Sequence, residues 1–205
     1  MAFQTTPRCI RACVCRRNEN WSGLLHRFQQ RGERIMIISS PKTSWTMGGM
    51  QPVISDSAYV SDTAVVIGDA VIAEEVMVAP GAVIRCDEGM PVFIGHGSNV
   101  QDHVVIHGLL EKKIIEGHQR YSVYIGKEVS CGHACVIHGP VCIGDGTFVG
   151  FTAVVHSSEV GKRVFIGHGA KVIGVRIADG KYVPHGAVIA DQETADRLGP
   201  VPDDL

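Results

Sequence analysis

Aliphatic residues recur every six positions along most of this chain, and no other feature limits its fold as strongly. Glycine or another small residue usually follows each of them, and a small or branched residue comes four places later. An α-helix repeats about every 3.6 residues and an amphipathic strand about every 2, so neither explains the pattern. A six-residue period is typical of a parallel β-helix. The residues that set the period are Ile54, Val60, Ile67, Ile72, Val78, Ile84, Ile94, Val100, Ile106, Ile125, Cys131, Ile137, Ile143, Val149, Val155, Val160, Ile166, Val172, Ile177, Val183 and Ile189.

In such a fold each six-residue unit supplies one short strand and one turn, and three units close a triangular coil. Stacked coils pair their backbones in parallel, which leaves unpaired strand edges only at the two ends. The 24 glycines and the low aromatic content of 6% suit tight turns around a thin core. The period is interrupted at Arg85–Phe93 and again at the segment LLEKKIIEGHQR, where we expect an excursion from the coil.

Residues 1–50 have no sustained period, and we assign them to an N-terminal extension. The segment is rich in arginine and poor in acids, as targeting peptides are. Two plainer alternatives stay open. The extension is either a disordered tail or the result of an over-long start, with Met36, Met47 or Met50 as the first residue.

The β-helix domain is expected at residues 51–190, and a short helix and tail at residues 191–205. The tail sequence ADQETADRLG lacks the six-residue period and contains good helix formers. Asp191 is a suitable N-cap because its side-chain oxygen can accept a hydrogen bond from a free backbone N–H of the first turn.

Composition narrows the functional classes. The formal net charge of −2 gives no basic excess for a nucleic-acid partner. No window approaches the roughly 18 apolar residues of a membrane span, so we expect no membrane anchor. The seven cysteines form no CxxC pair, which favours a reduced compartment, and we expect a cytoplasmic protein.

Two of the ten histidines can be placed on one outer face of the coils. His107 follows Ile106 and His138 follows Ile137, so both side chains point outward by the alternation of a strand. The two positions are one coil apart, and their side chains should stack at about the 4.7–4.9 Å spacing of neighbouring strands. Two imidazoles at this spacing can tilt onto one ion with Zn–N bonds of about 2.0–2.1 Å.

A third histidine, His133, lies in the preceding six-residue unit, on a different face of the same coil. It cannot easily reach His107 and His138 in its own chain, so as a ligand it must come from a neighbouring copy. A site that is split in this way and repeated by cyclic symmetry predicts a closed ring, most naturally a homotrimer. The alternative is a plain ladder of stacked histidines, with His156 as a further rung one coil on.

The segments IRCDEGMPVFIGHGSNVQDHVVIHG and YSVYIGKEVSCGHACVIHGP resemble the gamma-class carbonic anhydrases, including the archaeal prototype and the carboxysomal relatives. The resemblance extends from about residue 53 to the C-terminus, and its motifs occur in order and in the coil frame. It implies that the β-helix is left-handed, an exception to the usual right-handed crossover.

The resemblance also implies roles for individual residues. It makes His107 and His138 metal ligands from one subunit and His133 the ligand from the next. It makes Glu88 and Gln101 the catalytic pair that surrounds the metal-bound water and helps to orient or deprotonate it.

Other positions have supporting roles in this comparison. Arg85 and Asp87 match a pair that bridges subunits, and Asn99 and Asp102 fall on positions that tie down loops and support the ligands. Glu111 is a candidate proton shuttle in the excursion, although a solvated surface glutamate is the plainer interpretation.

The implied reaction is the reversible hydration of carbon dioxide to bicarbonate by a metal-bound hydroxide, with Zn²⁺ as the metal and Fe²⁺ or Co²⁺ compatible with the same ligands. One alternative is a weakly active or inactive relative with a role in assembly. Another is a hexapeptide acyltransferase, which shares the fold but needs only one catalytic histidine near a coenzyme A groove. The complete histidine set with Glu88 and Gln101 argues against the acyltransferase.

Overall fold

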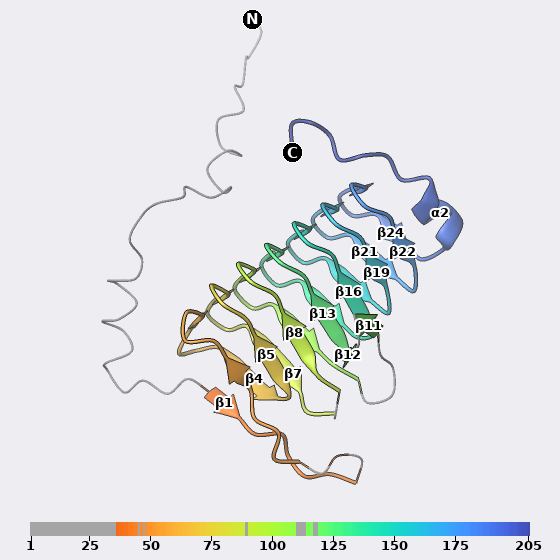
Figure 1. Cartoon of the computed structure of the whole chain (residues 1–205). Coiled ribbons are helices and arrows are strands. Elements are labelled where there is room, and N and C mark those ends of the chain that lie inside the picture. The colour runs from red at the N-terminus through yellow and green to blue at the C-terminus, as the bar shows by residue number, and fades with distance from the viewer. Residues whose placement is uncertain (1–35, 45, 47, 89, 110–113, 117–118) are drawn as a thin grey trace, which may run out of the picture. The chain divides into compact units, whose positions relative to one another are not determined.

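The computed structural model describes residues 36–205, except for 45, 47, 89, 110–113 and 117–118. In this part the chain is nearly all β and forms a left-handed parallel β-helix of about seven turns, with one short helix after it (Figure 1). The predicted fold class is therefore confirmed. The described residues up to Val201 form one compact unit.

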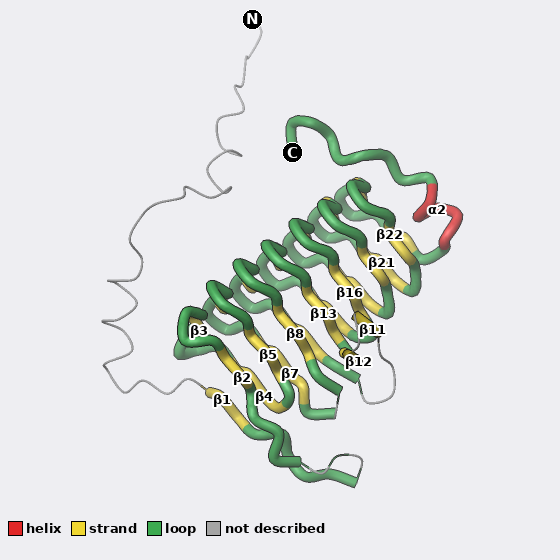
Figure 2. The backbone as a smooth tube through the Cα atoms, in the orientation of Figure 1, coloured by secondary structure: helices red, strands yellow, loops and turns green. Residues whose placement is uncertain are grey.

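Three parallel sheets, A, B and C, form the walls of the β-helix, and turns form its corners (Figure 2). Sheet A contains β1 (Met36–Ile38), β4 (Val65–Gly68), β7 (Val83–Cys86), β10 (Val105–His107), β15 (Val136–His138), β18 (Val154–His156), β21 (Lys171–Ile173) and β24 (Val188–Ile189). Sheet B contains β2 (Val53–Ile54), β5 (Ala70–Ile72), β8 (Val92–Ile94), β13 (Val123–Ile125), β16 (Val141–Ile143), β19 (Glu159–Val160) and β22 (Arg176–Ile177). Sheet C contains β3 (Tyr59–Val60), β6 (Met77–Val78), β9 (Asn99–Val100), β14 (Ser130–Cys131), β17 (Phe148–Val149), β20 (Phe165–Ile166) and β23 (Tyr182–Val183).

The core is a stack of the predicted repeat residues, with one correction: in β4 the inward residue is Val66, which pairs with Ile84, whereas the predicted Ile67 lies beside the outward Arg85. Ile84, Ile106 and Ile137 pair in consecutive rungs of sheet A, and all three are fully buried. Burying one such side chain contributes about 1.5–3 kcal/mol. Because the register keeps the same strand position inside from coil to coil, the neighbouring position on each strand always points outward.

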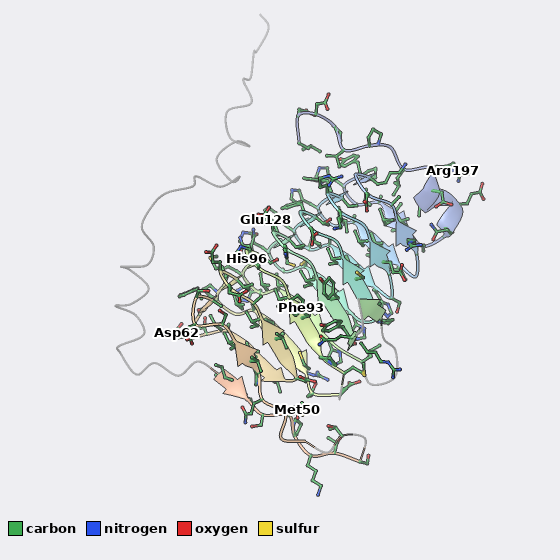
Figure 3. The ribbon with its side chains drawn as sticks, in the orientation of Figure 1. Met50, Asp62, Phe93, His96, Glu128 and Arg197 are labelled. Carbon is green, nitrogen blue, oxygen red and sulfur yellow. The ribbon has the colours of Figure 1, made fainter. Side chains whose placement is uncertain are left out.

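Hydroxyl groups at the corners join successive coils. Ser98 Oγ donates to the carbonyl oxygen of Gly126 at 2.9 Å and accepts from the N–H of Val129 at 3.1 Å. Ser98 is buried, as is Thr147, which makes the equivalent pair of bonds further along the chain. These side chains satisfy backbone groups that the turns leave unpaired. Where sheets B and C meet, the N–H of Glu128 donates to the carbonyl oxygen of His96, and Figure 3 shows both residues at the turns.

The C-terminal helix, α2, spans Gln192–Asp196. Asp191 caps it by accepting a hydrogen bond from the N–H of Thr194 at 2.8 Å, as the sequence predicts. No helix in the described residues is long and apolar enough to cross a membrane.

Two elements were not foreseen from the sequence. β1 pairs with β4 and adds a rung to sheet A ahead of residue 51, where the β-helix domain was expected to start. The excursion that follows His107 contains an antiparallel hairpin of β11 (Ile114–Glu116) and β12 (Gln119–Tyr121). The ring of Tyr121 packs against Phe93 at 5.8 Å, so sheet B anchors the hairpin.

Candidate metal centre

The outer surface of sheet A carries a ladder of basic side chains. Arg85, His107, His138 and His156 occupy the same strand position in four consecutive coils. The ring centroids of His107 and His138 are 5.0 Å apart, and those of His138 and His156 are 5.1 Å apart. The predicted stacking of His107 on His138 is confirmed.

Nitrogen atoms of the first two rings lie close enough to share a ligand. His107 Nδ1 and His138 Nε2 are 3.2 Å apart. In a tetrahedral site with Zn–N bonds of about 2.0–2.1 Å, two nitrogen ligands are about 3.3–3.4 Å apart. The other nitrogens, His107 Nε2 and His138 Nδ1, are buried and have no hydrogen-bond partner in the described structure. Unpaired buried polar atoms are costly, and this pair of imidazoles fits the half-site of a metal ion.

Carboxylates surround His107 on the side away from His138. Glu88 Oε1 lies 3.3 Å and Asp87 Oδ1 lies 3.9 Å from His107 Nε2. Arg85 holds both acids, with its Nε donating to Asp87 Oδ1 at 2.8 Å and its Nη2 lying 3.7 Å from Glu88 Oε1. Burial, and then the charge of Arg85, hold the pKa of His107 below its ordinary value, although the two acids act in the opposite direction. A neutral imidazole is the form that binds a metal.

His133 lies elsewhere, in the turn that leads from β14 to β15 at the corner between sheets C and A. Asp102 Oδ2 is 3.0 Å from His133 Nδ1, and the ring of Phe151 packs against the imidazole at 4.9 Å. The next residue, Ala134, has a φ of 56°, which turns the chain sharply towards sheet A. The contact with Asp102 orients the ring and leaves Nε2 as the nitrogen that can reach a metal.

Two further polar groups lie near this corner. Asn99 Oδ1 and Gln101 Oε1 are buried without a hydrogen-bond partner in the described structure. Gln101 directly precedes Asp102, the residue that contacts His133. The two unpaired acceptors and this contact therefore come from one short stretch of chain. Asn99, Gln101, Asp102 and His133 are called the corner cluster below.

Each chain therefore carries two separate clusters of candidate ligands. Arg85, Asp87, Glu88, His107 and His138 form the ladder cluster, and the corner cluster is separate from it. Within the described residues of one chain, no three His, Cys, Asp or Glu side chains are placed to hold a metal ion. Glu111 lies outside the described residues.

The sequence analysis missed Phe151, the residue that packs on His133. The signal was present, because Phe151 follows Gly150 as His133 follows Gly132, one coil earlier. The N–H of Thr152 donates to the carbonyl oxygen of His133, which shows the two turns to be stacked in register.

The chain is similar to known carbonic anhydrases. No family model matches it. A carbonic anhydrase of Methanosarcina thermophila is 44% identical over 178 residues, which cover 82% of this chain and 72% of the relative. The carboxysome assembly protein CcmM of a Nostoc species is 40% identical over 80% of this chain, which spans only 30% of CcmM.

Solved structures that resemble this one share its fold. A Bacillus cereus protein assigned as an acetyltransferase superposes with a TM-score of 0.59 at 24% identity and covers 71% of this chain and 76% of its own length. This likeness concerns the β-helix alone. The match to the Methanosarcina enzyme has a higher sequence identity and extends over most of both chains. The chain therefore belongs to the gamma-class carbonic anhydrase family.

Proposed function

We propose that this protein hydrates carbon dioxide reversibly to bicarbonate at a metal ion, held by His107 and His138 of one copy and His133 of the next. The observation that carries the proposal is the separation of 3.2 Å between His107 Nδ1 and His138 Nε2, on rings that stack one coil apart. This separation is close to the one that two nitrogen ligands of a single tetrahedral metal ion have.

The three histidines hold the metal, for which Zn²⁺ suits a nitrogen donor set and Fe²⁺ and Co²⁺ are compatible. When bound, the metal supplies Lewis acidity, which lowers the pKa of water towards neutrality and makes water a nucleophile for carbon dioxide. The ladder cluster supplies two of the ligands, and burial favours the neutral ring of His107 because it lowers the pKa of this residue. Asp102 fixes the ring orientation of His133 through Nδ1.

Glu88 and Gln101 act on the water. The water oxygen forms the new C–O bond, and Glu88 Oε1 accepts the proton that the water loses and passes it to solvent. Glu88 suits this role because its carboxylate lies 3.3 Å from the nitrogen of a ligand and is still partly exposed. Gln101 Oε1 is an unpaired acceptor, and a water O–H that donates to it is held in one orientation.

The outer face of sheet A supports assembly with further copies. Beside the histidines runs a valine column, one residue per coil, formed by Val65, Val83, Val105, Val136 and Val154. None of the five is fully buried, and Val105 is 37% exposed. A continuous apolar strip on a flat sheet is typical of a surface that another chain covers. A homotrimer, in which each ladder cluster meets a neighbour's corner cluster, buries the strip and completes three sites.

An assembly role is the second candidate. The match to CcmM, which is named for carboxysome assembly, covers 80% of this chain. In that case the metal stabilises the contact between copies without turnover.

Stopped-flow hydration of carbon dioxide separates the two candidates. The protein is purified without oxygen and loaded in turn with zinc and ferrous iron, beside His133→Ala and a matched His96→Ala control at an exposed turn. Metal-dependent turnover that disappears in His133→Ala and persists in His96→Ala supports the enzyme. A metal-loaded oligomer without turnover would leave the assembly role.

A further inference from the structure

We propose that the corner that carries His133 also contains a pH-sensitive clasp, formed by His168 and His185, which joins successive coils only while both imidazoles are neutral. The clasp would regulate how firmly the turn of Phe151 packs against His133. The importance of that contact for His133 as a ligand rests on the proposed function.

One side chain per coil stacks along this corner. Phe151, His168 and His185 follow His133 at the same turn position in successive coils. The hydrogen bonds between turns show this register: the carbonyl oxygens of His133, Phe151 and His168 each accept a hydrogen bond from the turn of the next coil. The rings of Phe151 and His168 are 4.3 Å apart with planes inclined by 25°. Those of His168 and His185 are 4.9 Å apart and inclined by 24°. The column is thus a continuous stack that begins on His133.

Each histidine of the clasp also accepts a backbone hydrogen bond from the preceding coil. The N–H of Phe151 donates to His168 Nδ1 at 2.9 Å, and the N–H of His168 donates to His185 Nδ1 at 2.8 Å. Nδ1 accepts only in the neutral ring with its proton on Nε2, and a protonated imidazole has N–H groups at both positions. Protonation of either ring therefore removes one bond between coils.

The surroundings of His168 oppose its protonation. Among the described residues, the aromatic side chains of Phe148, Phe165 and Tyr182 also pack against the two rings. In the part of the chain that the structure describes, no carboxylate is one of the groups that shift the pKa of His168, so no acid stabilises its imidazolium. Burial, and then the charge of His185, lower the pKa of His168. The bond to the neutral His168 ring therefore contributes its full stability above about pH 6.5, the usual histidine pKa, and loses it as the pH falls towards the pKa of His168.

The clasp reaches the proposed centre through Phe151. The Phe151 ring lies between His133 on one side and His168 on the other. Loss of the bond from the Phe151 N–H frees the turn that packs on His133. Since hydration of carbon dioxide releases a proton, acidification would weaken the third ligand of the proposed site.

Amide hydrogen exchange of the full chain without metal, followed residue by residue between pH 7.5 and 5.5, tests the clasp. After correction for intrinsic exchange, we expect the protection of the Phe151 amide to fall about tenfold per pH unit below about 6.5, until the pKa of His168 is reached. The chain contains a matched control. The N–H groups of Lys127 and Lys162 donate to carboxylates, Asp145 Oδ1 and Asp179 Oδ1, at the corner between sheets B and C. These two amides should keep their protection over the same pH range.

A variant provides a second test. In His168→Asn an amide oxygen can accept the bond from Phe151 but does not titrate in this range, so the pH dependence at Phe151 should disappear. Constant protection of Phe151 in the unmodified chain, or an equal loss at Lys127 and Lys162, would overturn the clasp. Neither result bears on turnover, so failure of the clasp is distinguishable from failure of the proposed reaction, which His133→Ala decides.

Discussion

His107 Nδ1 and His138 Nε2 lie 3.2 Å apart on neighbouring coils, and the remaining nitrogen of each ring is buried without a partner. The six-residue repeat explains this arrangement. Each coil returns the chain to the same strand position, so two histidines one coil apart share a face and must meet.

Replacement of His138 by alanine should abolish metal binding, while His156→Gln should retain it. His156 is the next rung of the ladder, but the proposed set of three ligands is complete without it. Metal content per chain, measured by mass spectrometry of the purified proteins, distinguishes the variants. Equal loss from both would show that the ladder binds metal without selection among its rungs.

Glu88→Gln should keep the metal but lower kcat about 10²-fold or more, since positioned acid–base groups contribute about 10²–10⁴-fold. The amide retains the size of the side chain and loses its ability to accept the proton of water. Stopped-flow assays with parallel metal analysis separate the two effects. An unchanged kcat would exclude Glu88 as the proton acceptor.

Ser98→Ala should lower the free energy of unfolding by about 1–3 kcal/mol, because the buried N–H of Val129 loses its acceptor. Thr63→Ala, at an exposed turn, is the control and should change stability by less than about 0.5 kcal/mol. Denaturant titration measures both. Similar values for the two variants would show that corner hydroxyls do not stabilise the coils.

Acid should selectively weaken the corner at Asp145. The bond from the Lys127 N–H, and then the Lys162 side chain, hold the pKa of Asp145 below its ordinary value of 3.8. Because the pKa of Asp145 is lowered by folding, the carboxylate contributes its full share of stability above pH 3.8. That contribution is lost as the pH falls through the pKa of Asp145 in the folded protein. Asp145→Asn should therefore lower Tm at pH 7, and the difference from the unmodified chain should shrink near pH 3. A difference that is constant with pH would contradict this account.

The sequence predicts the register of most strands, because the repeat residue points inward in each coil and its neighbours on the strand point outward; at β4 the prediction is wrong by one residue, since Val66 and not Ile67 pairs with Ile84. The pairing of Ile106 with Ile137 and the cap of α2 at Asp191 follow from local rules and are confirmed. The position of His133 is less well predicted, since the period identifies its unit but not its place on a corner turn. Phe151 was missed because its contact depends on how turns, not strands, stack.

Segments outside the repeat are harder to predict. β1 joins sheet A through backbone pairing alone, and a single apolar run of three residues carries no period. The hairpin of β11 and β12 depends on the packing of Tyr121 against Phe93, two residues that lie on either side of the excursion in the sequence.

Mixing two inactive variants is the most direct test of a site shared between copies. His107→Ala removes the ladder ligand and His133→Ala the corner ligand, so each protein alone should bind no metal and show no turnover. When the two are coexpressed, a trimer that contains both chains has one interface with an intact ladder cluster facing an intact corner cluster. Random assembly should restore about a quarter of the metal content and activity of the unmodified protein. If the mixture stays as inactive and metal-free as its components, the three histidines do not meet between copies.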